Sequence, residues 1–154
     1  MDRIDSAILA ALQNDGRMSN KELAAAVGLA PSSCLERVRR LHTRGVIRGY
    51  HAEIDPTAVG IGLQAFISVR LAQHTREAVD AFREHLNSLP EVVSIYHVAG
   101  QDDFVAHVAV RDANHLKNLT LDAFTTREEV ARLNTALVYE LVSESAWPNY
   151  ATDD

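Results

Sequence analysis

The sequence predicts an α+β protein in two parts, an N-terminal winged helix-turn-helix followed by a ferredoxin-like βαββαβ domain. Three short segments with helical apolar spacing occupy the first 45 residues. A stretch with proline and glycine then breaks the periodicity, and beyond it strand-like and helix-like segments alternate. We therefore expect domains over residues 1–54 and 64–145, a linker over 55–63 and a C-terminal tail over 146–154.

The first two helices are indicated by their apolar spacing and their caps. A helix is expected over residues 3–14, where isoleucines and leucines form one stripe and Asp2 can cap the start. Ser19 and Glu22 have the spacing of a capping box, in which each side chain accepts a hydrogen bond from the other residue's backbone. A second, short helix is therefore expected over residues 20–27.

A turn and a third helix complete the helix-turn-helix. Residues 28–30 read as a tight turn, and Pro31 suits the first position of a helix because its missing N–H costs nothing there. We expect this helix to end near Thr43. Residues 46–50 and 51–54 then have the composition of two short wing strands. The side chains expected to face the core from the third helix are Leu35, Val38 and Leu41.

The second half predicts one antiparallel sheet with two helices on the same face. The expected strands are 64–72, 92–99, 104–110 and 135–143, and the expected helices are 76–89 and 113–124. The second and third strands carry apolar side chains on both of their faces. A sheet that is covered on one side only should instead have a polar outer face. We therefore expect a second copy of the chain to cover the outer face, which makes the protein a homodimer or larger.

Charge and composition narrow the functional classes. The 154 residues carry a net charge of −6, but the first 60 hold eight basic and seven acidic residues, so the basic excess lies there. Between Pro31 and Tyr50 there are five arginines and one acid, Glu36. No apolar run is long enough for a membrane span, no signal peptide is evident, and the single cysteine, Cys34, excludes an internal disulfide. A cytoplasmic location is expected.

A basic helix after a tight turn is typical of a DNA-binding surface, because such a helix enters the major groove. Ser33 and Arg37 are expected to read base edges, whereas contacts to phosphate are expected more often from Arg40, Arg44 and Arg48. The alternative is a solvated helix that merely carries arginines. The expected partner is double-stranded DNA, and the expected DNA-binding residues are Ser32, Ser33, Arg37, Arg39, Arg40, Arg44 and Arg48.

Many short motifs occur in one register along the chain. They are Asp5, Ile8-Leu9, Asp15-Gly16-Arg17, Glu22-Leu23-Ala24, Val27-Gly28-Leu29, Cys34, Arg37-Val38 with Leu41, and the segment 45–50. Together they resemble the Lrp/AsnC (leucine-responsive regulatory protein) family of transcription regulators. The resemblance covers nearly the whole chain and implies a second half that binds ligands and assembles subunits, often into octamers. One departure is Ala30, where the family usually has a serine as the helix cap.

The hairpin loop of the second half is the candidate effector site. A glycine lets backbone amides approach a carboxylate, and an aspartate can hold an ammonium group, so a loop with both suits an amino acid. The resemblance aligns Gly100 and Asp103 with the family's Gly-x-x-Asp-aromatic loop and implies a ligand pocket between dimers. It also matches Thr135 with a threonine that the family places near this pocket. The expected effector-binding residues are Ala99, Gly100, Gln101, Asp103 and Thr135. The alternative is an ordinary polar hairpin turn.

Enzymatic and metal-binding functions find little support. The adjacent carboxylates Asp102 and Asp103 point apart at a strand end, which suits shared acid–base catalysis poorly. His97 and His107 flank one turn, but no metal-ligand spacing accompanies them. We therefore expect no enzyme, catalytic residue, metal or cofactor. The alternative to a ligand-controlled regulator is an architectural protein that organises DNA without a ligand.

Overall fold

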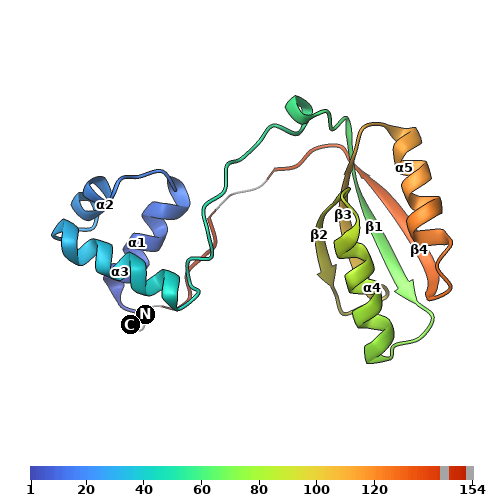
Figure 1. Cartoon of the computed structure of the whole chain (residues 1–154), viewed down its shortest axis with the longest axis horizontal. Helices are drawn as coiled ribbons and strands as arrows, with labels where there is room; N and C mark the ends of the chain where they lie inside the picture. The colour runs from blue at the N-terminus through green and yellow to red at the C-terminus, as the bar shows by residue number, and fades with distance from the viewer. Residues whose placement is uncertain (143–145, 152–154) are drawn as a thin grey trace. The chain divides into compact units, whose positions relative to one another are not determined.

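The computed structural model, which describes residues 1–142 and 146–151, separates the chain into two compact units. The N-terminal unit comprises Met1–Glu53 together with Val142–Asp154, and the C-terminal unit comprises Ile54–Leu141 (Figure 1). The expected domain end at residue 145 and the last residues of the expected tail, 152–154, lie outside the described part. Within the described residues, no helix is long and apolar enough to cross a membrane.

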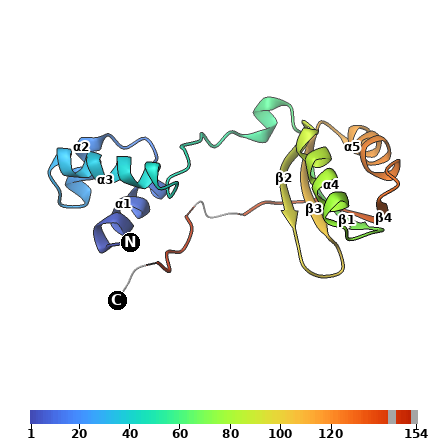
Figure 2. The same cartoon turned by 60° about the horizontal axis from the view of Figure 1, so that its bottom comes forward.

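Three helices form the N-terminal unit, as the sequence predicts (Figure 2). They are α1 (Arg3–Asn14), α2 (Asn20–Ala26) and α3 (Pro31–Thr43). Asp2 caps α1 by accepting a hydrogen bond from the Asp5 amide, and the capping box of Ser19 and Glu22 opens α2. At α3, the cap residue Ala30 offers no side-chain acceptor, so this helix begins without a side-chain cap.

The core of the N-terminal unit shows one error in the sequence prediction. On α3, Cys34 and Leu41 are fully buried and Val38 packs against them, whereas Leu35 is 38% exposed. The inward stripe therefore starts at Cys34 and follows the spacing i, i+4, i+7, because the small thiol fits where the helices approach one another. The buried members of this core are Ile8, Leu23, Ala24, Cys34, Leu41 and Ile47.

The two expected wing strands are absent from the described residues 46–54, which form no β-ladder. The Val46 and Ile47 amides instead donate to the Leu41 carbonyl, at 2.9 and 3.3 Å, and Ile47 is buried against the helices. These hydrogen bonds hold the first segment against the end of α3, and among the described residues neither segment has a partner strand. The prediction of a helix-turn-helix is confirmed, but its wing strands are wrong.

The start of the C-terminal tail lies in the N-terminal unit. The Gln13 side chain accepts a hydrogen bond from the Trp147 amide, at 2.6 Å, and donates to the Trp147 carbonyl, at 3.4 Å. This reciprocal pair attaches the backbone of the tail to α1, while the indole of Trp147 stays exposed.

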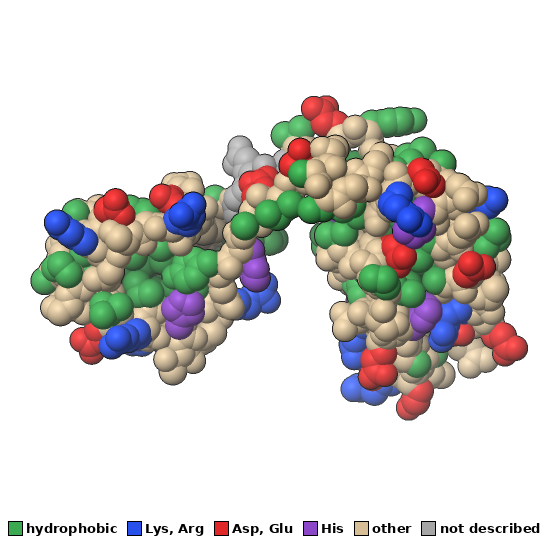
Figure 3. Space-filling view, turned by 45° about the horizontal axis from the view of Figure 1, so that its top comes forward, with side chains coloured by type: hydrophobic (Ala, Val, Ile, Leu, Met, Phe, Trp, Pro, Cys, Tyr) green, Lys and Arg blue, Asp and Glu red, His purple; other side chains and the backbone are tan. Residues whose placement is uncertain are grey.

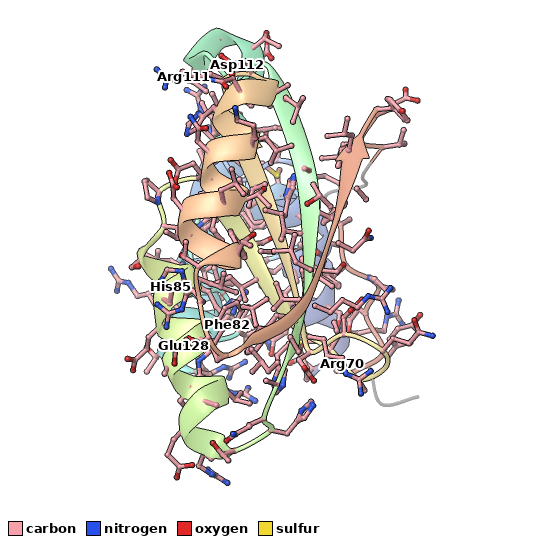
Figure 4. All side chains as sticks on the ribbon, turned by 90° about the vertical axis from the view of Figure 1, so that its right-hand side faces the viewer. Arg70, Phe82, His85, Arg111, Asp112 and Glu128 are labelled. Atoms are coloured by element: carbon pink, nitrogen blue, oxygen red, sulfur yellow. The ribbon has the colours of Figure 1, made fainter. Side chains whose placement is uncertain are left out.

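The C-terminal unit is the expected antiparallel sheet covered by helices on one face (Figure 4). Its strand order is β2-β3-β1-β4. The strands are β1 (Leu63–Leu71), β2 (Val92–His97), β3 (Phe104–Val110) and β4 (Val130–Val138). The helices are α4 (Arg76–Ser88) and α5 (Ala113–Leu119), which continues as the π-helical turn η2 (Thr120–Thr125); a 3-10 turn, η1 (Pro56–Val59), precedes β1.

Alternation along β1 and β3 divides the sheet into a buried inner face and an outer face. Phe82 of α4 lies between that helix and the sheet, and His85 joins α4 to η2 by donating to the Ala123 carbonyl at 2.7 Å (Figure 4). The buried inner residues of the sheet are Ala65, Ile67, Val69, Leu71, Phe104, Ala106, Val108 and Val110. The outer face carries Phe66, which is 36% exposed, beside His107.

The last strand begins five residues earlier than expected. The sequence predicts a strand over residues 135–143, but β4 spans Val130–Val138 and pairs with β1 from Val130 onward. Its pairing ends at Val138 opposite Gln64, because the chain before β1 turns toward β3, where the Gly62 amide donates to the Val110 carbonyl. Residues 139–142 therefore have no neighbouring strand, and the expected end at Ser143 lies outside the described residues.

Candidate DNA-binding surface and effector loop

The turn between α2 and α3 is fixed at both ends. Gly28 adopts a positive φ of 70°, which allows the left-handed turn that ends α2. The Leu29 amide donates to the Ala24 carbonyl at 2.9 Å, and the Asn20 side chain donates to the Pro31 carbonyl at 2.8 Å. The start of α2 is thereby attached to the start of α3, which sets the angle at which α3 is presented.

A buried carboxylate on α1 joins that helix to α3. The Asp5 side chain is 3% exposed and accepts from Arg37 Nη1 at 2.8 Å and from Arg40 Nη2 at 3.1 Å. Asp2 also accepts from Arg37 Nη1, at 2.6 Å. The hydrogen bond from the Asp5 amide and then that from Arg37 lower the pKa of Asp2, and the hydrogen bonds that Arg37 donates to Asp2 and Asp5 raise the pKa of Arg37. Two arginines that the sequence assigned to DNA are therefore bound within the protein.

The other expected DNA-binding residues lie on the surface. Arg39, Arg44 and Arg48 are exposed, and within the described residues none of their side chains forms an ion pair. Ser32 and Ser33 are exposed in the first turn of α3, where hydroxyl groups can reach base edges. On the face that Figure 3 presents, basic side chains lie around an apolar area of the N-terminal unit.

The expected effector loop connects β2 to β3. Gly100 has a φ of 145°, a conformation that strongly favours glycine, and Ala99 and Gln101 beside it are exposed. Arg70 of β1 donates to the Gln101 carbonyl at 3.2 Å. Within this described loop, the backbone amides of residues 100–102 donate no hydrogen bond, so they are available to an anion.

Asp103 is more deeply placed than the sequence suggests. It is 9% exposed, and its carboxylate accepts from the Leu71 amide at 2.7 Å and lies 3.1 Å from His74 Nδ1. Its oxygens therefore attach the effector loop to the end of β1 and to the segment before α4. The contact with His74 was not predicted, because nothing near His74 in the sequence indicates a partner 29 positions away.

Thr135 does not join the effector loop within one chain. It lies in β4 opposite Ile67, and β1 separates β4 from β3, to which the loop is attached. His97 and His107 also lie apart: His97 stacks on the buried Phe104, whereas His107 is bound to Gln64 on the outer face. Among the described residues, no group of three or more metal-binding side chains is close enough to hold an ion.

The sequence did not predict that Asp2 and Asp5 bind arginines of α3. From the sequence, Asp2 was expected only as a helix cap and Asp5 only as part of a family motif. A weak signal was present, because Asp5 stands beside apolar residues that form the inward stripe of α1. A carboxylate that is buried in this way needs a cationic partner.

Comparisons with known sequences agree with both units. The AsnC-type helix-turn-helix domain matches residues 1–42, and the Lrp/AsnC ligand binding domain matches residues 64–148. The HTH-type transcriptional regulator AldR of Mycolicibacterium smegmatis is 46% identical over 140 residues, which is 91% of this chain and 82% of that protein. The leucine-responsive regulatory protein of Rhizobium meliloti is 35% identical over 145 residues, 94% of this chain and 93% of that protein.

Solved structures with the same fold include two amino-acid complexes. A transcriptional regulator from Neisseria meningitidis in complex with L-Met has a TM-score of 0.89 and 32% identity, covering 96% of each chain. The feast or famine regulatory protein of M. tuberculosis complexed with L-methionine has a TM-score of 0.80 and 36% identity, covering 91% of this chain and 92% of that chain. The relatives are transcription regulators, not enzymes, as the sequence predicts. This chain belongs to the Lrp/AsnC family of transcription regulators.

Proposed function

We propose that this regulator recognises specific double-stranded DNA sites through the exposed side of α3. The observation that supports this most directly is a tightly held helix-turn-helix in which Arg39 of α3, with Arg44 and Arg48 beyond its end, is exposed and forms no ion pair within the described residues. In this proposal Ser32, Ser33 and Arg39 contact DNA from α3, while Arg44 and Arg48 bind phosphates beyond its end. We also propose a cytoplasmic location, because a regulator of this kind acts where the chromosome lies.

The salt dependence of binding tests the proposed phosphate contacts. Each phosphate contact adds about 0.9 to the slope of log K against log salt concentration. We expect Arg44→Ala and Arg48→Ala each to lower that slope by about this amount in fluorescence anisotropy titrations with duplex DNA. Arg76→Ala, in the other unit, removes the same charge and serves as the control. Equal slopes for all variants would contradict the proposed contacts.

The alternative, an architectural organiser, is distinguished by sequence preference. A specific regulator binds its site roughly 10³- to 10⁷-fold more tightly than random DNA, whereas an organiser shows little difference. The ordered turn and the short exposed serines of α3 favour a specific regulator, because phosphate binding alone needs neither. Comparable affinity for selected and random duplexes would support the organiser.

We also propose that an amino acid controls this regulator through the 99–103 loop. The unpaired amides of residues 100–102 suit a carboxylate, and two structural relatives were solved with L-methionine. Asp103 shapes the loop through Leu71 and His74, and Thr135 joins the site from another subunit. A ligand at 100 times its Kd stabilises the folded state by about 2.7 kcal/mol. Thermal unfolding with each of the twenty amino acids tests this, and Gly100→Ala should abolish the shift.

We further propose that the chain assembles through the outer face of its sheet. The outer face of the sheet exposes Phe66 and Tyr96, so a second copy is proposed to cover it. Association of such dimers into octamers would bring the loop of one dimer to another. We also propose the domain borders at residues 54 and 64, because the segment between them contains only the turn η1 before β1 begins at Leu63.

A further inference from the structure

The contacts of Asp5 determine which side chains of α3 face outward. Cys34 and Leu41 mark the inward side of the helix, and Arg37 and Arg40 are drawn toward α1 by Asp5. At about 3.6 residues per turn, the side opposite the core carries a different set of residues. These residues, all exposed, are Ser32, Glu36, Arg39 and Thr43.

Glu36 is the unusual member of this set. It is the one acid among five arginines in residues 31–50. A glutamate on a helix ordinarily pairs with a base four positions later, which here is Arg40. Arg40 Nη2 is instead bound to Asp5, at 3.1 Å, and Arg37 is bound to Asp2 and Asp5. Among the described residues, Glu36 has neither an ion pair nor a side-chain hydrogen bond.

A free carboxylate in this position restricts what DNA can offer it. Phosphates repel it, so Glu36 lowers the affinity for DNA in general. In the major groove, the donors available to a carboxylate are exocyclic amines, and the favoured partner of glutamate is N4 of cytosine. Arg37, by contrast, would have to leave two carboxylates, one of them buried, before it could reach a base.

We propose that Glu36 is a specificity-determining residue that accepts a hydrogen bond from a cytosine amine, and that Arg37 is a positioning residue that holds α3 against α1. This inference rests on the proposed DNA-binding function of α3. It changes the expected reading pair from Ser33 and Arg37 to an outward face centred on Glu36.

The test selects binding sites from a randomised double-stranded DNA library with the full-length wild type, Glu36→Gln and Glu53→Gln. Glu53 is exposed in the same unit, and its substitution removes the same charge. We expect one cytosine position of the wild-type consensus to relax or to shift to adenine in Glu36→Gln, because a glutamine side chain favours adenine. Discrimination at that position should fall by about 5- to 150-fold, with no change in Glu53→Gln. An unchanged Glu36→Gln consensus would overturn the inference, whereas no enrichment by wild type would overturn the proposed function itself.

The role of Arg37 has its own readout. Arg37→Ala should weaken binding to all sequences alike, while leaving both the consensus and the salt slope at wild-type values, because no DNA contact is lost. Arg37→Lys, which keeps one charged donor for the carboxylates, should recover part of the affinity. If Arg37→Ala does not fold, the salt slope and the consensus of Arg37→Lys show whether Arg37 contacts DNA. A slope lower by about 0.9, or a change in the preferred base, would show that Arg37 contacts DNA directly.

Discussion

Asp5 shows at the scale of single residues why the arginines of α3 are not equivalent. Its carboxylate lies in the N-terminal core and takes donors from two arginines that are 32 and 35 positions away. A sequence pattern shows the arginines as one basic cluster, and it cannot show which of them an acid on another helix binds. The basic character of α3 was therefore predictable, but its division into bound and free arginines depends on how α1 packs.

The pH dependence of stability tests the contacts of Asp2. Its pKa is lowered from the usual 3.8 by the Asp5 amide and by Arg37. A lowered pKa in the folded state means that the ionised carboxylate stabilises the protein above about pH 4. That contribution is lost as the pH falls through the lowered pKa. Asp2→Asn keeps the helix cap but removes the charge, so it should be less stable than wild type near neutral pH.

Chemical unfolding of wild type and Asp2→Asn between pH 7 and pH 2 measures this difference. We expect the two free energies of unfolding to converge at the acid end, where Asp2 is protonated in both states. Asp15→Asn is a suitable control, because Asp15 forms no ion pair in the described structure. A difference that stays constant down to pH 2 would exclude the ionised Asp2 as its source.

At the scale of elements, the helices were predicted more accurately than the last strand. The bounds of α1 and α3 follow from local signals, a cap at Asp2 and a proline at the first position of α3. The position of β4 follows from its pairing with β1, which the local sequence does not contain. The segment 139–142 has as much strand character as β4, yet it has no partner. The wing strands failed for the same reason.

The missing cap of α3 offers a stabilising substitution. Ala30 already has the extended backbone of a cap residue, with φ −66° and ψ 143°, but no side-chain acceptor. Ala30→Ser should accept a hydrogen bond from the start of the helix and raise the free energy of unfolding by about 0.5–2 kcal/mol. Ala52→Ser, at an exposed position outside any helix, is the control. Denaturant unfolding followed by circular dichroism measures the free energy of unfolding. Equal stability of the two variants would show that a serine at position 30 does not cap α3.

The entry to β1 depends on the absence of a side chain at Gly62. A Cβ atom at this position would clash with the Arg111 carbonyl oxygen, a backbone atom that cannot move aside freely. Gly62→Ala should therefore destabilise the C-terminal unit by about 1–3 kcal/mol, as overpacking does elsewhere. Gly49→Ala is the matched control, because its Cβ would meet only the His51 side chain, at 3.3 Å. Thermal unfolding compares the two variants. The expectation fails if Gly62→Ala unfolds at the same temperature as the wild type.

At the scale of the whole molecule, the sheet is the part that one chain leaves incomplete. Its inner face is buried by α4, α5 and η2, while its outer face exposes Phe66 against His107, whose pKa is lowered by burial. The sequence predicted this two-sided apolar character from strand alternation, and the exposure of Phe66 and Tyr96 agrees with it. The sequence pattern does not show which residue of that face makes the main contact with a second copy, but a substitution can test it directly.

Phe66→Arg should separate the proposed dimer. Phe66 lies near the middle of β1, a central strand of the sheet, and it is exposed enough for arginine to be accommodated in an isolated chain. An aromatic anchor contributes about 2 kcal/mol or more, and a two-fold interface loses it twice, so the dimer Kd should rise on the order of 10³-fold. Sedimentation equilibrium measures this, with Val59→Arg in η1 as an exposed apolar control. If Phe66→Arg keeps the wild-type Kd and Val59→Arg does too, the subunits must associate through another surface, such as the free edge of β2.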